Sequence, residues 1–191
     1  MNIEEYGGHL REALERSEVY AAPGSYLHRM GLEIHEMVKA YSNDGTGFFT
    51  DGDLVNALAA YTYGAGWLEA GCFLGIIMAN SSAVLSNPHF DEGIPPTLES
   101  HLREKTERYL SMASAALEVI ECAPDKGSIL FIAAEEMRAR VLLFVEDGYR
   151  MNQQNSNQDA LGFVSYGYGM LDAGVRAGLF EIRAKRHLFT I

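Results

Sequence analysis

Cysteine is scarce in this chain of 191 residues, which contains only Cys72 and Cys122. Two cysteines form neither a disulfide framework nor the ligand set of a structural zinc site, so we expect reduced thiols and a cytoplasmic protein. Positive charge is also limited, with 15 lysine and arginine residues against 26 aspartate and glutamate residues. The net charge of −11 repels phosphate backbones, so we expect no nucleic-acid partner.

The chain also lacks the marks of a signal peptide. Residues 1–5 are acidic and have no basic or long apolar stretch. Residues 57–79 carry a single charge, Glu69, over a length that would cross a bilayer. The matching segment of the second half carries Asp172 and Arg176, each of which would cost about 2.5–3.5 kcal/mol at a bilayer centre. We therefore expect a buried core helix and no membrane partner.

A repeat is the clearest feature that the sequence does contain. Residues 63–75 return as residues 166–178, with the same tyrosine, the same four glycines, a leucine, an acid and an alanine at matching places. The offset is 103, the difference between 166 and 63. This constant offset indicates a tandem duplication in which two similar units share one core.

The same offset relates the helices predicted just before these segments. Apolar residues recur at helical spacing through both, with polar residues on the other faces. Ser25 and Ser128 are suited to cap the two helix starts. Gly45 and Gly148 stand just past the apolar stripes, where a left-handed glycine commonly ends a helix. We therefore expect both helices to end at these glycines.

The long repeated helix is expected to begin near Asp51 or Asp53 in the first unit and at Ser156 in the second. Ser156 and Asp159 resemble a capping box, because a serine is followed by an acid three residues later.

A further helix is predicted ahead of each pair, over residues 9–20 and, with a stronger pattern, over residues 98–120. The tetrapeptide His-Leu-Arg-Glu occurs at residues 9–12 and again at residues 101–104, an offset of 92. This different offset indicates either a longer first helix in the second unit or a chance match.

No alternating run of apolar and polar residues predicts a sheet. Prolines flank an acidic, glycine-containing stretch between the units, where a helix cannot continue. We therefore expect an all-α fold: helical repeats at residues 1–85 and 97–191, joined by a linker at residues 86–96. The two three-helix repeats are expected to pack as one helical bundle with pseudo-twofold symmetry.

Residues 172–179 read Asp-Ala-Gly-Val-Arg-Ala-Gly-Leu and follow Tyr166 and Gly169. This pattern resembles the C-terminal helix of the archaeal family known as domain of unknown function 357. The resemblance covers residues 98–182 and extends to residues 25–78 through the internal repeat. It implies a compact helical fold, an archaeal cytoplasmic protein and self-association, and it brings no established activity and no assigned site residues.

Three of the four recurring glycines lie within one broad face of the long helix. They are Gly64, Gly71 and Gly75 in the first copy and Gly167, Gly174 and Gly178 in the second. A glycine inside a helix costs about 1 kcal/mol relative to alanine, so their recurrence indicates a steric need. The GxxxG spacing favours close packing of the two long helices, against each other or against a partner chain, over a cleft for a ligand.

Glu69 and Asp172 are equivalent acids inside mostly apolar helices, where a carboxylate must be paired or protonated. Arg176 lies one turn after Asp172 and is its predicted partner. The competing interpretation is a binding or acid–base site. Its candidate residues are Glu69, Asp172, Tyr63, Tyr166, Trp67 and Arg176. The chain has no Glu-x-x-His spacing of the kind found in di-iron bundles, and we predict no metal and no cofactor.

Residues 42–53 resemble a calcium-binding loop, with Gly47 at the turn position. Ser42 replaces the opening aspartate and Asp53 the closing glutamate, which weakens coordination. Residues 145–156 of the second unit keep none of the pattern. We expect a plain loop between two helices and no tight calcium binding.

The sequence shows no nucleophile paired with a base, and both units keep packing residues. We therefore predict a non-catalytic interaction or scaffold protein, with a homo-oligomer or another protein as partner. The alternative is a small-molecule- or metal-binding protein or enzyme, with a site between the repeats near Glu69 and Asp172. A polar pocket around these acids would favour the alternative, and a dry glycine-lined contact would favour the scaffold.

Overall fold

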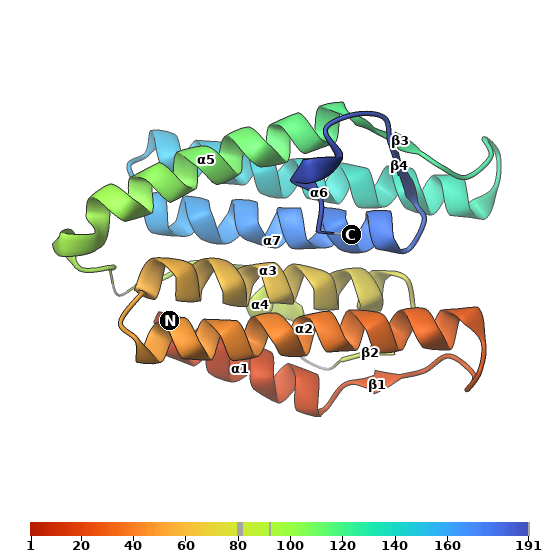
Figure 1. The fold of residues 1–191 in the computed structure, drawn as a ribbon, viewed down its shortest axis with the longest axis horizontal. Helices are drawn as coiled ribbons and strands as arrows, with labels where there is room; N and C mark the ends of the chain where they lie inside the picture. Colours follow the sequence, from red (N-terminus) through yellow and green to blue (C-terminus); the bar gives the residue numbers. More distant parts are fainter. Residues whose placement is uncertain (80–81, 92, 191) are drawn as a thin grey trace.

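A computed structural model describes residues 1–79, 82–91 and 93–190 (Figure 1). The helices are α1 (Ile3–Glu15), α2 (Tyr26–Thr50), α3 (Leu54–Phe73), α4 (Ser82–Leu85), η1 (Pro96–Leu98), α5 (Glu99–Glu118), α6 (Ile129–Gln153), α7 (Asn157–Arg176) and η2 (Arg186–Leu188). The strands are β1 (Glu18–Val19), β2 (Ile77–Met78), β3 (Ile120–Cys122) and β4 (Phe180–Ile182).

The predicted all-α duplication is confirmed. The bounds of α2 and α3 recur in α6 and α7 with the offset of 103 at both ends of each helix. Each repeat also closes with a small antiparallel ribbon, β1 with β2 and β3 with β4, which the sequence did not predict. Within the described ranges, no helix is long and apolar enough to span a membrane.

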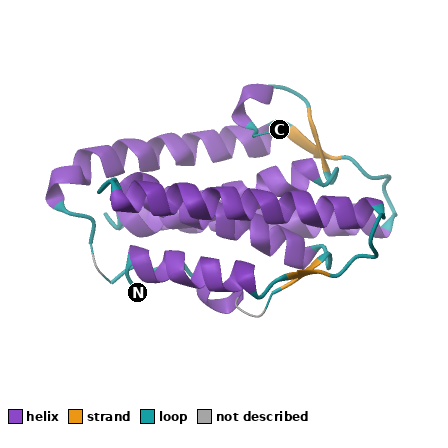
Figure 2. Ribbon diagram, turned by 60° about the horizontal axis from the view of Figure 1, so that its bottom comes forward, coloured by secondary structure: helices purple, strands orange, loops and turns teal. Residues whose placement is uncertain are grey.

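Helices α3 and α7 lie side by side in the middle of the bundle. Figure 1 shows α1 and α2 on one side of this pair and α5 and α6 on the other. Figures 1 and 2 both show the two ribbons at the same end of the molecule, which corresponds to a pseudo-twofold axis along the length of the bundle. The two central helices are buried almost throughout, so the repeats share one core.

The first helix of each unit differs from its predicted bounds. Helix α1 begins at Ile3 rather than near residue 9, because Asn2 and Glu5 form a capping box. The backbone N–H of Glu5 donates to Asn2 Oδ1 at 2.8 Å, and that of Asn2 donates to Glu5 Oε2 at 2.9 Å. Helices α1 and α5 end at Glu15 and Glu118, again 103 residues apart. Helix α5 is therefore longer at its start, and the tetrapeptide match with an offset of 92 is a coincidence.

The predicted serine caps of α2 and α6 are confirmed. The Ser25 hydroxyl accepts from the backbone N–H of His28 at 3.0 Å, and the Ser128 hydroxyl accepts from that of Phe131 at 3.1 Å.

The predicted start of the long helix is confirmed in both units, because Asp53 and Ser156 directly precede α3 and α7. Asp53 caps α3 by accepting from the backbone N–H of Asn56 at 3.1 Å. The predicted capping box of α7 is wrong. The Ser156 hydroxyl makes no bond to the helix backbone and donates instead to Asp159 Oδ2 at 3.1 Å. The Asp159 carboxylate is also held by the backbone N–H of Phe90 in the connecting segment.

The expectation that α2 and α6 end at Gly45 and Gly148 is wrong, because both helices continue to Thr50 and Gln153. The two glycines serve packing rather than termination. A Cβ on Gly45 would lie 2.5 Å from the ring of Tyr61, and one on Gly148 would lie 3.1 Å from Leu110. Close neighbours, not a left-handed turn, account for glycine at these places.

The longer α2 also replaces the expected loop between helices at residues 42–53. Residues up to Thr50 are helical, and only a short turn separates α2 from α3. Side chains along a helix point in different directions, so the acids of this segment do not surround one point as calcium ligands do.

The glycines inside the long helices are buried, whereas Gly75 and Gly178 of the predicted set are exposed. The closest contact falls on a pair outside the predicted set. A Cβ on Gly66 would lie 2.0 Å from the carbonyl oxygen of Tyr166, and one on Gly169 would lie 2.1 Å from that of Tyr63. Here α3 and α7 touch backbone to backbone. The contact is reciprocal: Gly66 of α3 faces Tyr166 of α7, and its counterpart Gly169 of α7 faces Tyr63 of α3.

The predicted glycines have other roles. Gly71 and Gly174 face side chains of their own repeats, with Ile77 2.7 Å and Met137 2.6 Å from the added Cβ. Gly75 and Gly178 lie just beyond the helices with φ of +67° and +78°. They are left-handed helix ends, which glycine adopts without steric cost.

We expect Gly66→Ala to destabilise the protein, because the new methyl group would collide with the Tyr166 carbonyl. Overpacking of this kind costs about 1–3 kcal/mol or more. Gly47→Ala is the matched control, since its Cβ would meet no atom within 4 Å inside helix α2. The control should gain up to about 1 kcal/mol from helix propensity. Urea unfolding of both variants measures the difference, and equal effects would contradict the close contact.

Candidate functional site

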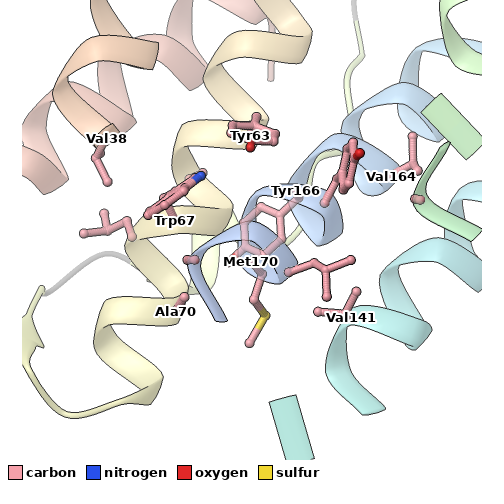
Figure 3. Packing of buried hydrophobic residues seen from close by; sticks show 14 of the residues in the cluster. Val38, Tyr63, Trp67, Ala70, Val141, Val164, Tyr166 and Met170 are labelled. Atoms are coloured by element: carbon pink, nitrogen blue, oxygen red, sulfur yellow. The ribbon is translucent and has the colours of Figure 1, made fainter. Parts of the chain in front are cut away.

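Two tyrosine–carboxylate pairs flank the contact between α3 and α7. The Tyr63 hydroxyl of α3 donates to Asp172 Oδ2 of α7. At the equivalent place on the other flank, Tyr166 of α7 lies beside Glu69 of α3 and opposes the rise in the pKa of that acid. Figure 3 shows Tyr63 and Tyr166 projecting from their two helices among the buried side chains. Each tyrosine thus reaches the acid of the other repeat, and the candidate site is split into two related halves.

Asp172 is fully buried. Its Oδ2 accepts from Tyr63 and from the backbone N–H of Thr190 at 3.1 Å, while among the described residues its Oδ1 has no hydrogen-bond partner. Burial raises the pKa of Asp172, and the bonds from Tyr63 and Thr190 oppose part of that rise. The predicted pair with Arg176 is wrong. The Asp172 carboxyl is held by the other repeat and the C-terminal segment instead.

Glu69 is less enclosed, with 17% of its side chain exposed. Its Oε1 lies 3.4 Å from Arg140 Nη1 of α6, so its ionic partner comes from the second repeat. Burial raises the pKa of Glu69, and Arg140 and Tyr166 oppose the rise. The two acids that the sequence placed in one site therefore differ in burial and in partners.

Trp67 and Arg176 line a second cleft, of about 560 Å³, together with Glu33 and Thr190. Arg176 Nε lies 2.8 Å from Glu33 Oε2, which links α7 to α2 across the repeats. The Trp67 ring is buried, and its Nε1 has no partner among the described residues. Neither residue contacts the Glu69 half of the site in any hydrogen bond or ion pair of the described part of the chain.

A cleft of about 400 Å³ opens beside the Tyr63–Asp172 pair. It lies between the repeats, and the segment 187–190 forms one wall, because Tyr168 donates to the Leu188 carbonyl and Thr190 bonds to Asp172. The chain residues that line it include Tyr41, Asp44, Tyr63, Lys105, Tyr109 and Tyr168. Sequence reasoning missed Lys105, although a lysine next to Thr106 in the apolar stripe of α5 was a signal.

The equivalent flank, beside Glu69 and Tyr166, is filled more tightly. The space beside these residues is about 10 Å³ and is bounded by Cys72 and Leu85. Burial raises the pKa of the Cys72 thiol to about 11, and nearby Glu69 contributes to the rise. A thiol with this pKa is a poor nucleophile at neutral pH. No cluster of three or more metal-ligating side chains occurs in the part of the chain that the structure describes.

The reciprocal pairs are suited to joining the repeats. Burial raises the pKa of both Tyr63 and Tyr166 well above the ordinary value, so at neutral pH they stay protonated and act as hydrogen-bond donors. A buried carboxylate that accepts such bonds is partly compensated for the loss of water. The two pairs, Tyr63 with Asp172 and Tyr166 with Glu69, therefore link α3 to α7 on both flanks of their contact.

A family model described as a protein of unknown function (DUF357) matches the chain twice, at residues 5–77 and 108–180. Both ends of the two matches are 103 residues apart, the offset that relates the helices. No curated protein and no solved structure matches the chain.

We expect the stability contributed by Asp172 to decline as the pH rises. Because burial raises its pKa in the folded state, the folded protein binds this proton more tightly than the unfolded chain does. That contribution is complete below the unfolded pKa and is lost as the pH rises through the folded pKa. The free energy of unfolding of the native protein, relative to Asp172→Asn, should therefore fall with rising pH across the acidic range.

Urea unfolding at a series of acidic pH values measures this difference. Glu33→Gln is the control, because it removes an acid of a half-exposed ion pair, and such pairs contribute about 0–1 kcal/mol. An advantage of the native protein over Asp172→Asn that grows with rising pH would contradict the assignment.

Proposed function

Because this chain belongs to the DUF357 family of unknown function, as two tandem copies, we propose its function from its own surface and contacts. It is a non-catalytic interaction protein that binds a second copy of itself through the outer face of α6. The observation that carries this proposal is the self-complementary pattern of exposed residues on that face.

The absence of a catalytic arrangement among the described residues supports a binding role. Glu69 and Asp172, the sharpest candidates for acid–base chemistry, are engaged by Tyr166 and Tyr63. These contacts join α3 to α7, which is a structural role for both acids. The glycine-lined contact of α3 with α7 is the dry contact expected of a scaffold.

The outer face of α6 exposes large apolar side chains that nothing in the described chain covers. Ile132 is 52% exposed and Leu142 is 46% exposed, with exposed Ala139 on the same face. Single apolar residues are common on protein surfaces, but a row along one helix is typical of an interaction surface. The small side chain of Ala139 allows close approach of another helix.

The charges on this face favour a second copy as the occupant. In an antiparallel contact of two α6 helices centred near Met137, Ile132 of one copy lies opposite Leu142 of the other. Glu135 then lies within about one residue of the position opposite Arg138 of the other copy, close enough for an ion pair. A twofold interface makes each contact twice, so one such pattern brings two apolar pairs and two ion pairs together. Opposite charges across an interface fix the register of the partners.

A charge exchange tests this contact. Arg138→Glu alone should shift a dimer toward monomer, because the substituted acid would face Glu135 of the other copy and repel it. The double variant Glu135→Arg with Arg138→Glu should restore the dimer, because opposite charges face each other again. Size-exclusion chromatography with light scattering and native mass spectrometry measure the mass. A monomeric native protein, or a dimer unchanged in Arg138→Glu, would overturn the proposal.

The single variants Leu142→Glu and Leu32→Glu form a matched pair for the same measurement. Both leucines are 46% exposed, but Leu32 lies on α2. The Leu142 variant should lose the dimer and the Leu32 variant should keep it. Equal loss in both would point to a general effect of added charge.

A further inference from the structure

We propose that the cleft beside Tyr63 and Asp172 binds a small aromatic carboxylate, whose acid group contacts Lys105 and whose ring lies against tyrosines. This inference is independent of the proposed self-association, because the cleft lies on the seam between the repeats and not on the outer face of α6.

Four tyrosine rings form a continuous aromatic lining in this cleft. Tyr41 and Tyr63 have ring centroids 4.4 Å apart. Tyr168 meets Tyr63 edge-on at 6.2 Å and Tyr109 edge-on at 6.4 Å. Aromatic side chains attract a further flat ring through offset or edge contacts in the same range of distances. The lining therefore favours a planar ligand over a branched aliphatic one.

Lys105 places a positive charge at the Tyr109 end of the lining. The residue is 7% exposed, and its Nζ lies 4.9 Å from the centroid of the Tyr109 ring. Its one hydrogen bond in the described structure goes to the neutral Asn56 Oδ1 at 2.5 Å. Asn56 in turn donates to Asp53 Oδ2 at 2.5 Å, so the hydrogen bonds connect Lys105 to Asp53 only through an amide.

An ammonium group has three donors and needs a counter-charge when it is buried. Among the described residues, no carboxylate forms an ion pair with Lys105. Burial lowers the pKa of Lys105, and Arg108 adds to the effect, while the charges of Asp53 and Glu104 oppose it only in part. A carboxylate in the cleft would supply the missing charge and fill the remaining donors.

Asp44 sets the orientation of the ligand. It lines the same cleft close to Tyr41, whose pKa it helps to raise. An acid group is repelled by Asp44 and attracted by Lys105, so the ring is directed toward the tyrosines. The volume of about 400 Å³ lies in the range of small-molecule sites, about 300–1,000 Å³.

The duplication provides an internal comparison. With the offset of 103, the counterpart of Lys105 is Asn2 and that of Tyr168 is Ala65. Helix α1 folds and packs without a lysine there. The repeat fold therefore does not require this lysine, which belongs to one cleft alone.

Benzoate and benzylamine test the site, because they share a ring and differ in the sign of charge. We expect benzoate, added to ¹⁵N-labelled protein, to shift the amide signals of Tyr41, Asn56, Lys105 and Tyr168. Benzylamine should bind more weakly. Lys105→Gln should weaken benzoate at least tenfold, Lys105→Arg should retain binding, and Lys39→Gln, an exposed lysine of α2, should have no effect.

The pH dependence gives a second measurement that needs no variant. Because the pKa of Lys105 is lowered, its ammonium is lost at a lower pH than that of an ordinary lysine, and benzoate affinity should fall in the same alkaline range. The proposal is overturned if benzoate leaves the cleft signals unshifted, if Lys105→Gln binds it as tightly as the native protein, or if benzylamine binds more tightly.

Discussion

The direct backbone contact between α3 and α7 is the constraint on which the rest of the structure depends. At Gly66 and Gly169 there is no room for even a Cβ, because the carbonyl oxygens of Tyr166 and Tyr63 occupy that space. At this contact the two helices leave no space for water between them, and they bury each other along most of their length. Each repeat alone would expose this face, so the fold requires both repeats together.

The closeness of these helices also places the polar groups. A tyrosine beside the contact reaches the acid of the opposite helix, which gives the Tyr63–Asp172 and Tyr166–Glu69 pairs. The two flanks then diverged in their surroundings. One pair is covered by the chain end and borders the larger cleft, while the other is bounded by the connecting segment and held by Arg140. A symmetric framework thus carries two unequal surfaces.

The repeats also show how a core conserves volume when its residues change. In the first repeat the Tyr61 ring lies between Gly7 and Gly45, with a hypothetical Cβ on each glycine 2.5 Å from it. In the second repeat the equivalents of Gly7 and Tyr61 are Leu110 and Val164, and both contact Gly148. In the second repeat, Leu110 is larger than its counterpart Gly7, while Val164 is smaller than its counterpart Tyr61. Such exchanges are tolerated because the total volume is kept.

The sequence by itself determined the elements that depend on nearby residues. Helical periodicity gave the all-α class, the constant offset gave the two repeats, and the serine caps at Ser25 and Ser128 were correct. Only the tertiary structure decided the partners of Asp172, the role of Gly66 and the burial of Lys105. Periodicity reports one helix at a time, whereas these contacts join residues far apart in the chain, and their distances follow from how the helices pack.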